Sequence, residues 1–344
     1  MSIGVGLVSF TTLPTAIPTT TLDLGDDTPV WDVLSQLGKI KMNQVDPNVA
    51  GVSAQRGADL IFRGYSAEQD GEGKTKLQSP HFKCTACHNT KQEVRDLADI
   101  NAQDRLEYAI EQDLPFLQGS TFHGIVNRAT FYNDDYQKKY NGVEGIRNSF
   151  NDIRAAIRFC ATECAQGRAL EDWEVESILA YFWTKELLVK DLKLKEDEKQ
   201  KINQSLKDEK NVARAIHLME DHYLRSSPAH FSEQDMEYKP LTEGQLNDKK
   251  SLENGKQIYE RGCLHCHGEQ KYSFFNLDDS ELSFKQLLKK TKKNDRSSIY
   301  KITRHGTYSY AGKKAYMPQY PLEKMSDAQL QDLRVYIENK ALGN

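Results

Sequence analysis

The chain contains the pattern Cys-x-x-Cys-His twice, as CTACH at residues 84–88 and as CLHCH at residues 263–267. In this pattern two thiols bond to the vinyl groups of a porphyrin, and the histidine that follows is placed to ligate its iron. One copy would be compatible with chance or with half of a zinc site, whereas two complete copies indicate two covalently bound haem c groups. The predicted attachment and ligand residues are Cys84, Cys87 and His88 for haem 1, and Cys263, Cys266 and His267 for haem 2.

Composition limits the classes of protein that this chain can belong to. It has 344 residues, 38% of them hydrophobic, and a formal net charge of -4, which does not favour a nucleic-acid-binding protein. No stretch of about 18 apolar residues is present, so we expect no transmembrane span. Haem c is normally attached outside the cytoplasm, so we expect a periplasmic or otherwise exported protein. Residues 1–10 lack the positive start of a signal peptide, and the Thr- and Pro-rich residues 11–21 are typical of an extended arm.

A weak internal repeat predicts an all-α protein with two cytochrome c-like helical haem domains, joined by a charged helical linker. Residues 57–64 and 255–262 both carry glycines seven apart around apolar residues, and each precedes a haem motif. Each copy also ends in an apolar helix, and the second of these begins with the capping box Ser326 to Gln329. The predicted division is an N-terminal arm at 1–50, a first cytochrome domain at 51–190, a linker at 191–250 and a second cytochrome domain at 251–344.

The second axial ligand of each haem must come from outside the motif, usually from methionine or histidine. Met317 lies in a Met-Pro pair fifty residues after His267 and just before the closing helix, so we predict it as the ligand of haem 2. Met325 is the second candidate. No methionine follows the first motif within its own domain, so haem 1 requires another type of ligand.

Four residues are candidates for the second ligand of haem 1. His81 is too close in the chain to the motif to reach the far face easily, whereas His123 is plausible because haems with two histidine ligands are common. Cys160 and Cys164 fall on the apolar face of a predicted helix, in the region where a distal ligand belongs. We favour Cys160, followed by His123 and then Cys164, and two buried structural thiols remain the alternative.

Residues 160–170, CATECAQGRAL, resemble a motif of the dihaem thiosulfate dehydrogenases, Cys-x-x-Arg-Ser-Met-Asn-Gly-x-x-Leu. Cys160, Gly167 and Leu170 align without a gap, and Gln166 replaces the asparagine. The resemblance implies a His/Cys-ligated first haem, a His/Met or His/Lys second haem, and oxidation of thiosulfate in which Cys160 is catalytic.

The sequence departs from that motif at the Arg-Ser pair implicated in holding the anionic substrate, where this chain has Glu163 and Cys164. A carboxylate at that place would repel thiosulfate. Four nearby arginines are candidates to replace the missing positive charge: Arg147, Arg154, Arg158 and Arg168.

Two functions are therefore open. The first is an enzyme that converts thiosulfate to tetrathionate, or the reverse, at haem 1 and passes electrons through haem 2. The second is a non-catalytic dihaem electron carrier or a subunit of a respiratory complex, in which the cysteine only sets the haem potential. Both require a redox partner protein, such as another cytochrome or a terminal oxidase or reductase. The basic residues 289–293 beside haem 2 are a candidate docking surface for an acidic partner, although an ordinary exposed helix end is the favoured interpretation. A dihaem peroxidase is less favoured, because nothing marks its calcium site.

Overall fold

The computed structural model describes residues 24–232, 236–307 and 316–343, and within these ranges it is helical and contains no strand. The predicted all-α fold class is therefore confirmed. The expectations for residues 1–10 and 11–21 lie outside the described residues. The α-helices are α1 (Val30–Gln36), α2 (Ala54–Arg63), α3 (Ala102–Glu111), α4 (Asp134–Lys139), α5 (Ile153–Phe159), α6 (Asp172–Trp183), α7 (Glu196–Asp208), α8 (Val212–Glu220), α9 (Glu243–Leu246), α10 (Lys249–Ile258), α11 (Leu264–His267), α12 (Glu281–Thr291), α13 (Ile299–His305) and α14 (Asp327–Ala341). The 3-10 turns are η1 (Cys84–Ala86), η2 (Ile125–Asn127) and η4 (Val189–Leu192), and the π-helical turns are η3 (Cys160–Cys164) and η5 (Tyr259–Cys263).

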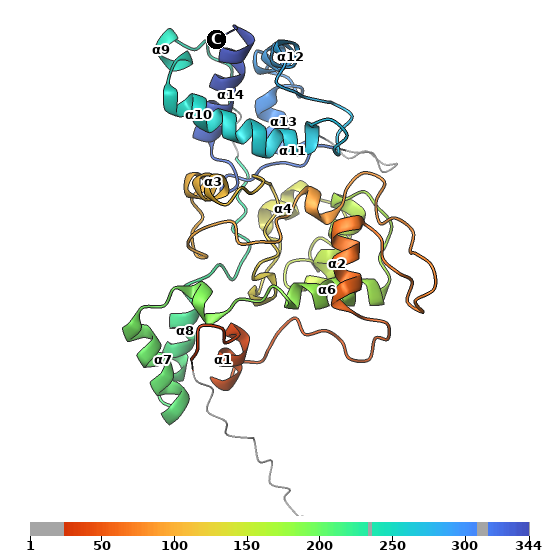
Figure 1. The fold of residues 1–344 in the computed structure, drawn as a ribbon, viewed down its shortest axis with the longest axis vertical. Coiled ribbons are helices and arrows are strands. Elements are labelled where there is room, and N and C mark those ends of the chain that lie inside the picture. The colour runs from red at the N-terminus through yellow and green to blue at the C-terminus, as the bar shows by residue number, and fades with distance from the viewer. Residues whose placement is uncertain (1–23, 233–235, 308–315, 344) are drawn as a thin grey trace, which may run out of the picture.

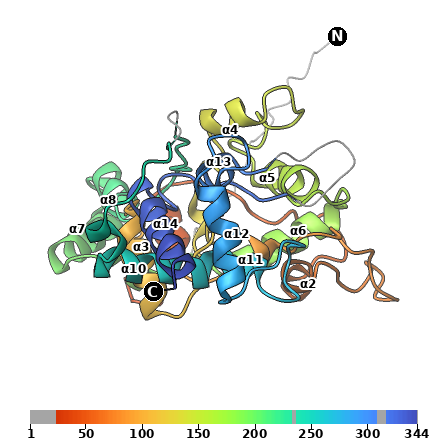
Figure 2. The same cartoon turned by 90° about the horizontal axis from the view of Figure 1, so that it is seen from above.

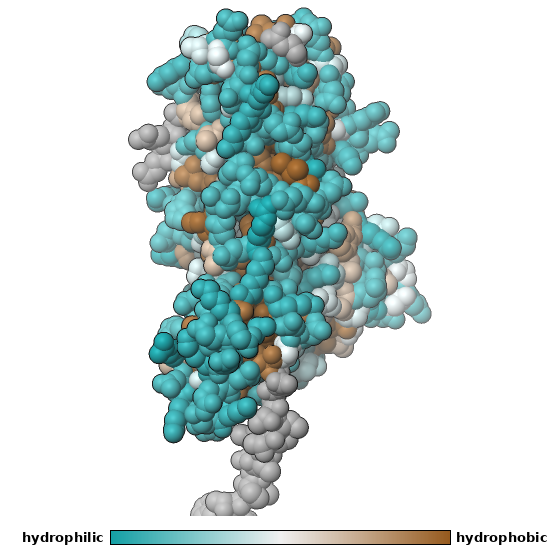
Figure 3. Space-filling model, turned by 60° about the vertical axis from the view of Figure 1, so that its left-hand side comes forward, coloured by the Kyte–Doolittle hydropathy of each residue, from teal (hydrophilic) through white to brown (hydrophobic). Residues whose placement is uncertain are grey.

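The helices form three groups along the long axis of the molecule (Figure 1). Helices α9 to α14 lie at one end, α2, α4 and α6 in the middle, and α1, α7 and α8 at the other end. Seen along that axis, α7 and α8 lie to one side and α2 and α6 to the other (Figure 2). Figure 3 shows one face, on which hydrophilic residues predominate and hydrophobic ones form scattered groups. In the described part of the chain, none of the helices has the length and apolar character needed to cross a bilayer.

The two repeat helices each cross a closing helix at a glycine. A side chain at Gly57 would place its Cβ 1.9 Å from the backbone oxygen of Ser177 on α6. A side chain at Gly255 would place its Cβ 2.2 Å from the backbone oxygen of Asp332 on α14. Both glycines therefore allow two helix backbones to approach more closely than any other residue would permit. Each repeat helix therefore packs on the closing helix of its own copy.

Helix ends also follow local sequence signals. The Ser326 side chain accepts from the backbone N–H of Gln329 at 3.2 Å, and the Gln329 side chain accepts from the N–H of Ser326 at 3.0 Å, which confirms the predicted capping box. Helix α2 ends at Gly64 in the left-handed conformation, and an insertion separates it from the first haem motif. By contrast, α10 runs directly through η5 into the second motif.

Of the five hydrophobic clusters among the described residues, the three largest correspond to the three groups of helices. The middle core is built from α2, α6 and the residues around η2. The core of α10 to α14 also takes in Leu106 and Ala109 from α3, far earlier in the chain. In the third core, Trp31 of α1 packs with Ile202 and Met219 from α7 and α8. Residues assigned from sequence to the N-terminal arm and to the charged linker thus share one core.

Candidate haem sites

In the first motif, the His88 ring is held by Ser120 and Phe122. Its Nδ1 lies 2.6 Å from the carbonyl oxygen of Ser120, and its ring stacks on Phe122 with centroids 4.8 Å apart. Gly119 is needed here, because a Cβ at this position would lie 2.7 Å from the imidazole ring. When Nδ1 donates to the carbonyl of Ser120, Nε2 is left as the free nitrogen, which is the arrangement that orients a metal-bound histidine.

A large cavity opens in front of His88. It has an empty volume of about 1400 Å³, part of which is open to solvent, and its walls are mainly apolar and aromatic. Cys84, Cys87 and His88 line one part of it, and Cys160 and Cys164 also line it. A cavity with two thiols, an oriented imidazole and an apolar lining fits a covalently bound porphyrin. The other apolar and aromatic lining residues include Leu60, Phe82, Phe122, Ile125, Phe131, Tyr132, Tyr136, Tyr140, Ile153, Ile157, Leu170, Ile178, Phe182 and Tyr316.

The two spare cysteines lie in one turn of π-helix, η3, which extends α5. The backbone N–H of Ala165 donates to the carbonyl of Cys160 at 2.7 Å, which widens the turn by one residue. The Cys164 sulfur contacts the hydroxyls of Tyr132 at 3.7 Å and Tyr140 at 3.6 Å. Hydrogen bonds from Cys160, Tyr140 and Tyr132 lower the pKa of Cys164 to about 7, against the effect of burial. The hydrogen bond to Cys164 and burial raise the pKa of the Cys160 thiol.

His123 lies away from these sulfur atoms. It lines a different, smaller cavity, and its Nε2 lies 3.8 Å from the carboxylate of Asp191. Burial lowers the pKa of His123, and Asp191 raises it in part. His81 is likewise not among the residues that line the large cavity. Of the four ligand candidates for haem 1, the structure therefore brings the two cysteines, and not the histidines, into the cavity with His88.

The four arginines considered as replacement anion ligands are engaged elsewhere. Each pairs with a carboxylate, and none lines the large cavity. The pairs are Arg147 with Asp134, Arg154 with Glu176, Arg158 with Asp172 and Arg168 with Glu174. Glu163 does not line the cavity either, whereas the basic residues Lys83 and Arg128 do. Three of these arginines pair with carboxylates of α6 and Arg147 pairs with one of α4, so their charges are directed away from the cavity.

The second motif repeats the geometry of the first. The Nδ1 of His267 lies 2.8 Å from the carbonyl oxygen of Phe275, which again leaves Nε2 free. Cys263 ends the π-turn η5, and Cys266 lies on α11 next to His267. The backbone N–H of Leu277 donates to the His267 carbonyl at 2.7 Å and closes this loop.

Met317 lies on the segment that returns to α14. Its backbone N–H donates to the Thr307 hydroxyl at 2.7 Å, and its carbonyl accepts from the Thr307 N–H at 2.9 Å. Its neighbours Tyr316 and Pro318 line the haem 1 cavity, and Met317 does not. Met325, the second candidate, is buried in the core of α10 to α14.

The two haem motifs touch each other. The Nε2 of His265 lies 3.2 Å from the carbonyl oxygen of Thr85, and the Cys266 sulfur lies 3.7 Å from the carbonyl oxygen of Ala86. Tyr272 and Tyr316 pack beside this contact, in a small apolar cluster that includes Ala86. Sequence reasoning missed this contact, since nothing in either pentapeptide indicates which surface meets the other.

The segment 250–337 matches a family model described as cytochrome C oxidase, cbb3-type, subunit III. It includes the second motif, the crossing of α10 with α14, and the Met317 segment. Residues 250–337 form a c-type cytochrome domain. Such a domain implies covalently bound haem c and a role in electron transfer. The first motif lies outside this cytochrome domain. Comparisons with curated proteins and with solved structures found no match.

Proposed function

We propose that the chain is a dihaem c-type cytochrome that moves electrons between a haem at residues 84–88 and a haem at residues 263–267. The observation that carries this proposal is the direct contact between the two motifs, through His265 to Thr85 and Cys266 to Ala86. Cys87 and Cys266, which would each hold one haem, lie on the two sides of this contact. The haem groups supply one-electron redox chemistry, and the chain holds them close together.

For haem 1 we propose His88 and Cys160 as axial ligands. Both cysteines line the cavity, but the Cys164 sulfur is already engaged by two tyrosine hydroxyls, whereas the hydrogen-bond partner of Cys160 is Cys164 itself. Metal binding deprotonates a thiol outright, so the raised pKa of Cys160 does not oppose this role. For haem 2 we propose His267 and Met317, since Met317 lies on the segment that borders both motifs.

An anionic thiolate lowers the potential of haem 1 relative to a His/Met haem, because negative charge disfavours the added electron. Electrons would then pass from haem 1 to haem 2 and leave through the surface around His267. Lys290 lies over the ring of Phe275 at 5.6 Å, and the carbonyl of Phe275 holds His267. We propose that an acidic redox protein docks there, with the chain exported to the compartment where haem c is attached.

Pulsed photoreduction tests the electron path. After one electron is delivered, we expect reduced haem 1 to pass it to haem 2 within one molecule, at a rate that does not depend on protein concentration. A rate proportional to protein concentration would show that transfer runs between molecules and would contradict the proposal. The variant His265→Ala removes one of the two contacts between the motifs and is expected to slow the intramolecular phase.

A second candidate function is thiosulfate oxidation, favoured by one observation: the two cysteines outside the haem motifs, Cys160 and Cys164, line the same cavity as the basic residues Arg128 and Lys83. In this reaction two thiosulfate ions each lose one electron and join through a new S–S bond, and each haem takes one electron. In the role proposed for Cys160, its thiolate sulfur would bond to the sulfane sulfur of one thiosulfate as two electrons leave, one to each haem. A second thiosulfate would then attack that sulfane sulfur, break its bond to Cys160 and release tetrathionate and the thiolate. The basic side chains would attract the anion to the cavity.

Mixing the oxidised protein with thiosulfate tests this candidate. We expect thiosulfate to reduce the haems, as followed by their absorbance, at a rate that rises with thiosulfate concentration. We expect this reduction to be lost in Cys160→Ala. Absence of reduction in a protein that dithionite reduces fully would remove thiosulfate as the substrate and leave the electron-carrier function in place.

A further inference from the structure

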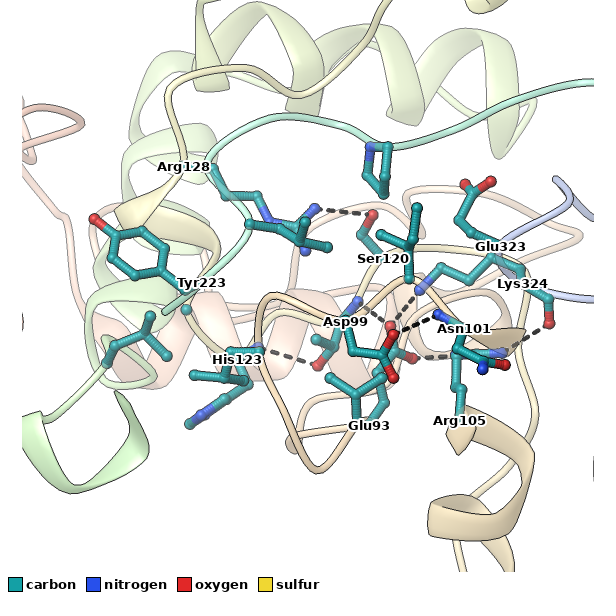
Figure 4. A pocket seen from close by; sticks show the side chains of 18 residues that line it. Glu93, Asp99, Asn101, Arg105, Ser120, His123, Arg128, Tyr223, Glu323 and Lys324 are labelled. Atoms are coloured by element: carbon teal, nitrogen blue, oxygen red, sulfur yellow. Dashed lines mark hydrogen bonds and ion pairs between the residues drawn. The ribbon is translucent and has the colours of Figure 1, made fainter. Parts of the chain in front are cut away.

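A second cavity, with an empty volume of about 630 Å³, adjoins the large one, and Ser120 and Arg128 line both (Figure 4). It is lined by residues of the first domain, by Tyr223 and Leu224, and by Glu323 and Lys324 of the second domain. Its wall carries a buried cluster of three charges, Glu93, Arg105 and Lys324, which are only 4%, 3% and 8% exposed. None of these three residues lines the large cavity.

Both carboxylate oxygens of Glu93 accept hydrogen bonds from the cations of this cluster. Arg105 Nη2 donates to one carboxylate oxygen of Glu93 at 3.0 Å, and Lys324 Nζ donates to the other. Arg105 also donates to the carbonyl of Leu117 at 2.6 Å and to the carbonyl of Lys324 at 3.0 Å. Burial alone would raise the pKa of Glu93, but Arg105 and Lys324 lower it, so the carboxylate is charged. Lys324 therefore joins the two domains at a buried ion pair.

The same charges reach the loop that holds His88. The backbone N–H of Thr121 donates to Glu93 at 3.3 Å, and Arg128 Nη1 donates to the Ser120 hydroxyl at 3.2 Å. Ser120 is the residue whose carbonyl accepts from His88. Burial lowers the pKa of His88, while the Ser120 carbonyl and Glu93 raise it and Lys324 and Arg128 lower it. The charges of the cluster thus act on the imidazole through a buried region where screening by water is weak.

From this geometry we infer that Glu93 and Lys324 are positioning residues that set the redox potential of haem 1, and that Lys324 makes this potential depend on the second domain. The inference rests on the proposed function, since it requires a haem at residues 84–88. Neither residue touches the reacting atoms. They act through the Ser120–Thr121 loop and through their electric field at His88.

Glu93 and Lys324 carry opposite charges, so removing each charge is expected to shift the redox potential of haem 1 in opposite directions. Reduction adds one negative charge to the haem, so a nearby cation favours the reduced state and a nearby anion favours the oxidised state. Glu93→Gln removes an anion and is expected to raise the potential, whereas Lys324→Gln removes a cation and is expected to lower it. A loss of packing or of loop order would not produce opposite shifts from two members of one cluster.

The test is a redox titration of the holoprotein and its variants, in which haem 1 is the component that is lost in Cys84→Ala/Cys87→Ala. We expect each single variant to change the ratio of reduced to oxidised haem 1 by about tenfold, or about 59 mV for one electron, in opposite directions. Lys324→Arg keeps the charge and is expected to stay within about threefold of the wild type.

Glu220→Gln is the matched control. Glu220 is also a buried carboxylate held by two cations, Lys39 and Arg225, but it lies at the end of α8, away from both motifs. It is expected to leave the potential of haem 1 unchanged.

Shifts of the same sign in both variants, no shift in either, or an equal shift in Glu220→Gln would overturn the inference. If Glu93→Gln does not fold, the contrast between Lys324→Gln and Lys324→Arg decides. A wild-type protein with no haem at residues 84–88 refutes the proposed function and this inference together. A protein that carries that haem, with an unmoved potential in the variants, refutes this inference alone.

Discussion

Cys160 and Cys164 show what can be read from the sequence at the scale of a residue. Their spacing and apolar neighbours predict a shared inward face, and both line the cavity. They lie in a π-turn, in which the N–H of Ala165 donates to the carbonyl of Cys160. The residue types in this segment do not predict that turn. His123 is a candidate ligand of haem 1 by residue type. Its position in the chain does not predict that the loop after Ser120 turns its side chain into the smaller cavity.

The sulfur ligand of haem 1 is testable by magnetic spectroscopy of the oxidised protein. We expect a low-spin thiolate signal that disappears in Cys160→Ser, because serine supplies no thiolate to the iron. Cys164→Ser serves as the paired control and is expected to keep the signal. Loss of the signal in Cys164→Ser, with retention in Cys160→Ser, would assign the ligand to the other cysteine.

Glu93 also has a consequence for acid stability. Its pKa is lowered in the folded protein, so its ion pairs contribute stability above the unfolded pKa of about 4.3, and this contribution is lost as the pH falls below that value. Glu93→Gln leaves two buried cations without their partner and is expected to cost about 3 kcal/mol near pH 7.

Chemical denaturation at several pH values measures this effect. The difference in unfolding free energy between the wild type and Glu93→Gln should shrink as the pH falls below about 4. A difference that stays constant with pH would show that the charge of Glu93 does not stabilise the fold.

At the scale of an element, the sequence is most informative where backbone sterics decide. The two repeats carry glycines at matching places, and in the structure Gly57 of α2 lies at the crossing with α6 and Gly255 of α10 at the crossing with α14. The capping box at Ser326 was predictable because its chemistry is local. The packing of α3 into the core of α10 to α14 was not, since it joins residues that are distant in the chain.

Substituting the crossing glycine tests the structural role of the repeat. Gly57→Ala would press a Cβ against the backbone oxygen of Ser177, which cannot move as a flexible side chain does, so we expect a loss of about 3 kcal/mol. Gly244→Ala on α9 is the control, because nothing lies within 4 Å of its added Cβ. Thermal unfolding of both variants measures the contrast, and equal melting temperatures would show that α2 and α6 do not cross as described.

At the scale of the whole molecule, contacts cross the boundaries that a division of the chain into consecutive segments would draw. They join the two haem motifs and the three largest hydrophobic cores. Trp31 packs with helices of the predicted linker, and Lys324 reaches the first domain. The sequence indicated two haem motifs, but their mutual contact depends on how the cores assemble. Residue patterns record the period of each helix and carry no direct record of distances between helices.

The charge distribution leads to a prediction about partner binding. Lys290 and its basic neighbours lie beside the second motif, so Lys290→Glu is expected to slow reduction of an acidic acceptor protein several-fold at low salt. Raising the salt concentration should remove the difference, because mobile ions screen exposed charges. Lys207→Glu on α7, at the opposite end of the molecule, is the control and should have a smaller effect (Figure 1). Equal slowing by both variants would indicate a general charge effect in place of docking near haem 2.

The most direct test of the central claim is the intact mass of the protein, purified after export from a host that attaches haem c. The account predicts two haem additions, of which one is lost in Cys84→Ala/Cys87→Ala and the other in Cys263→Ala/Cys266→Ala. A wild-type mass with a single addition at residues 263–267, and unmodified cysteines at 84 and 87, would contradict it.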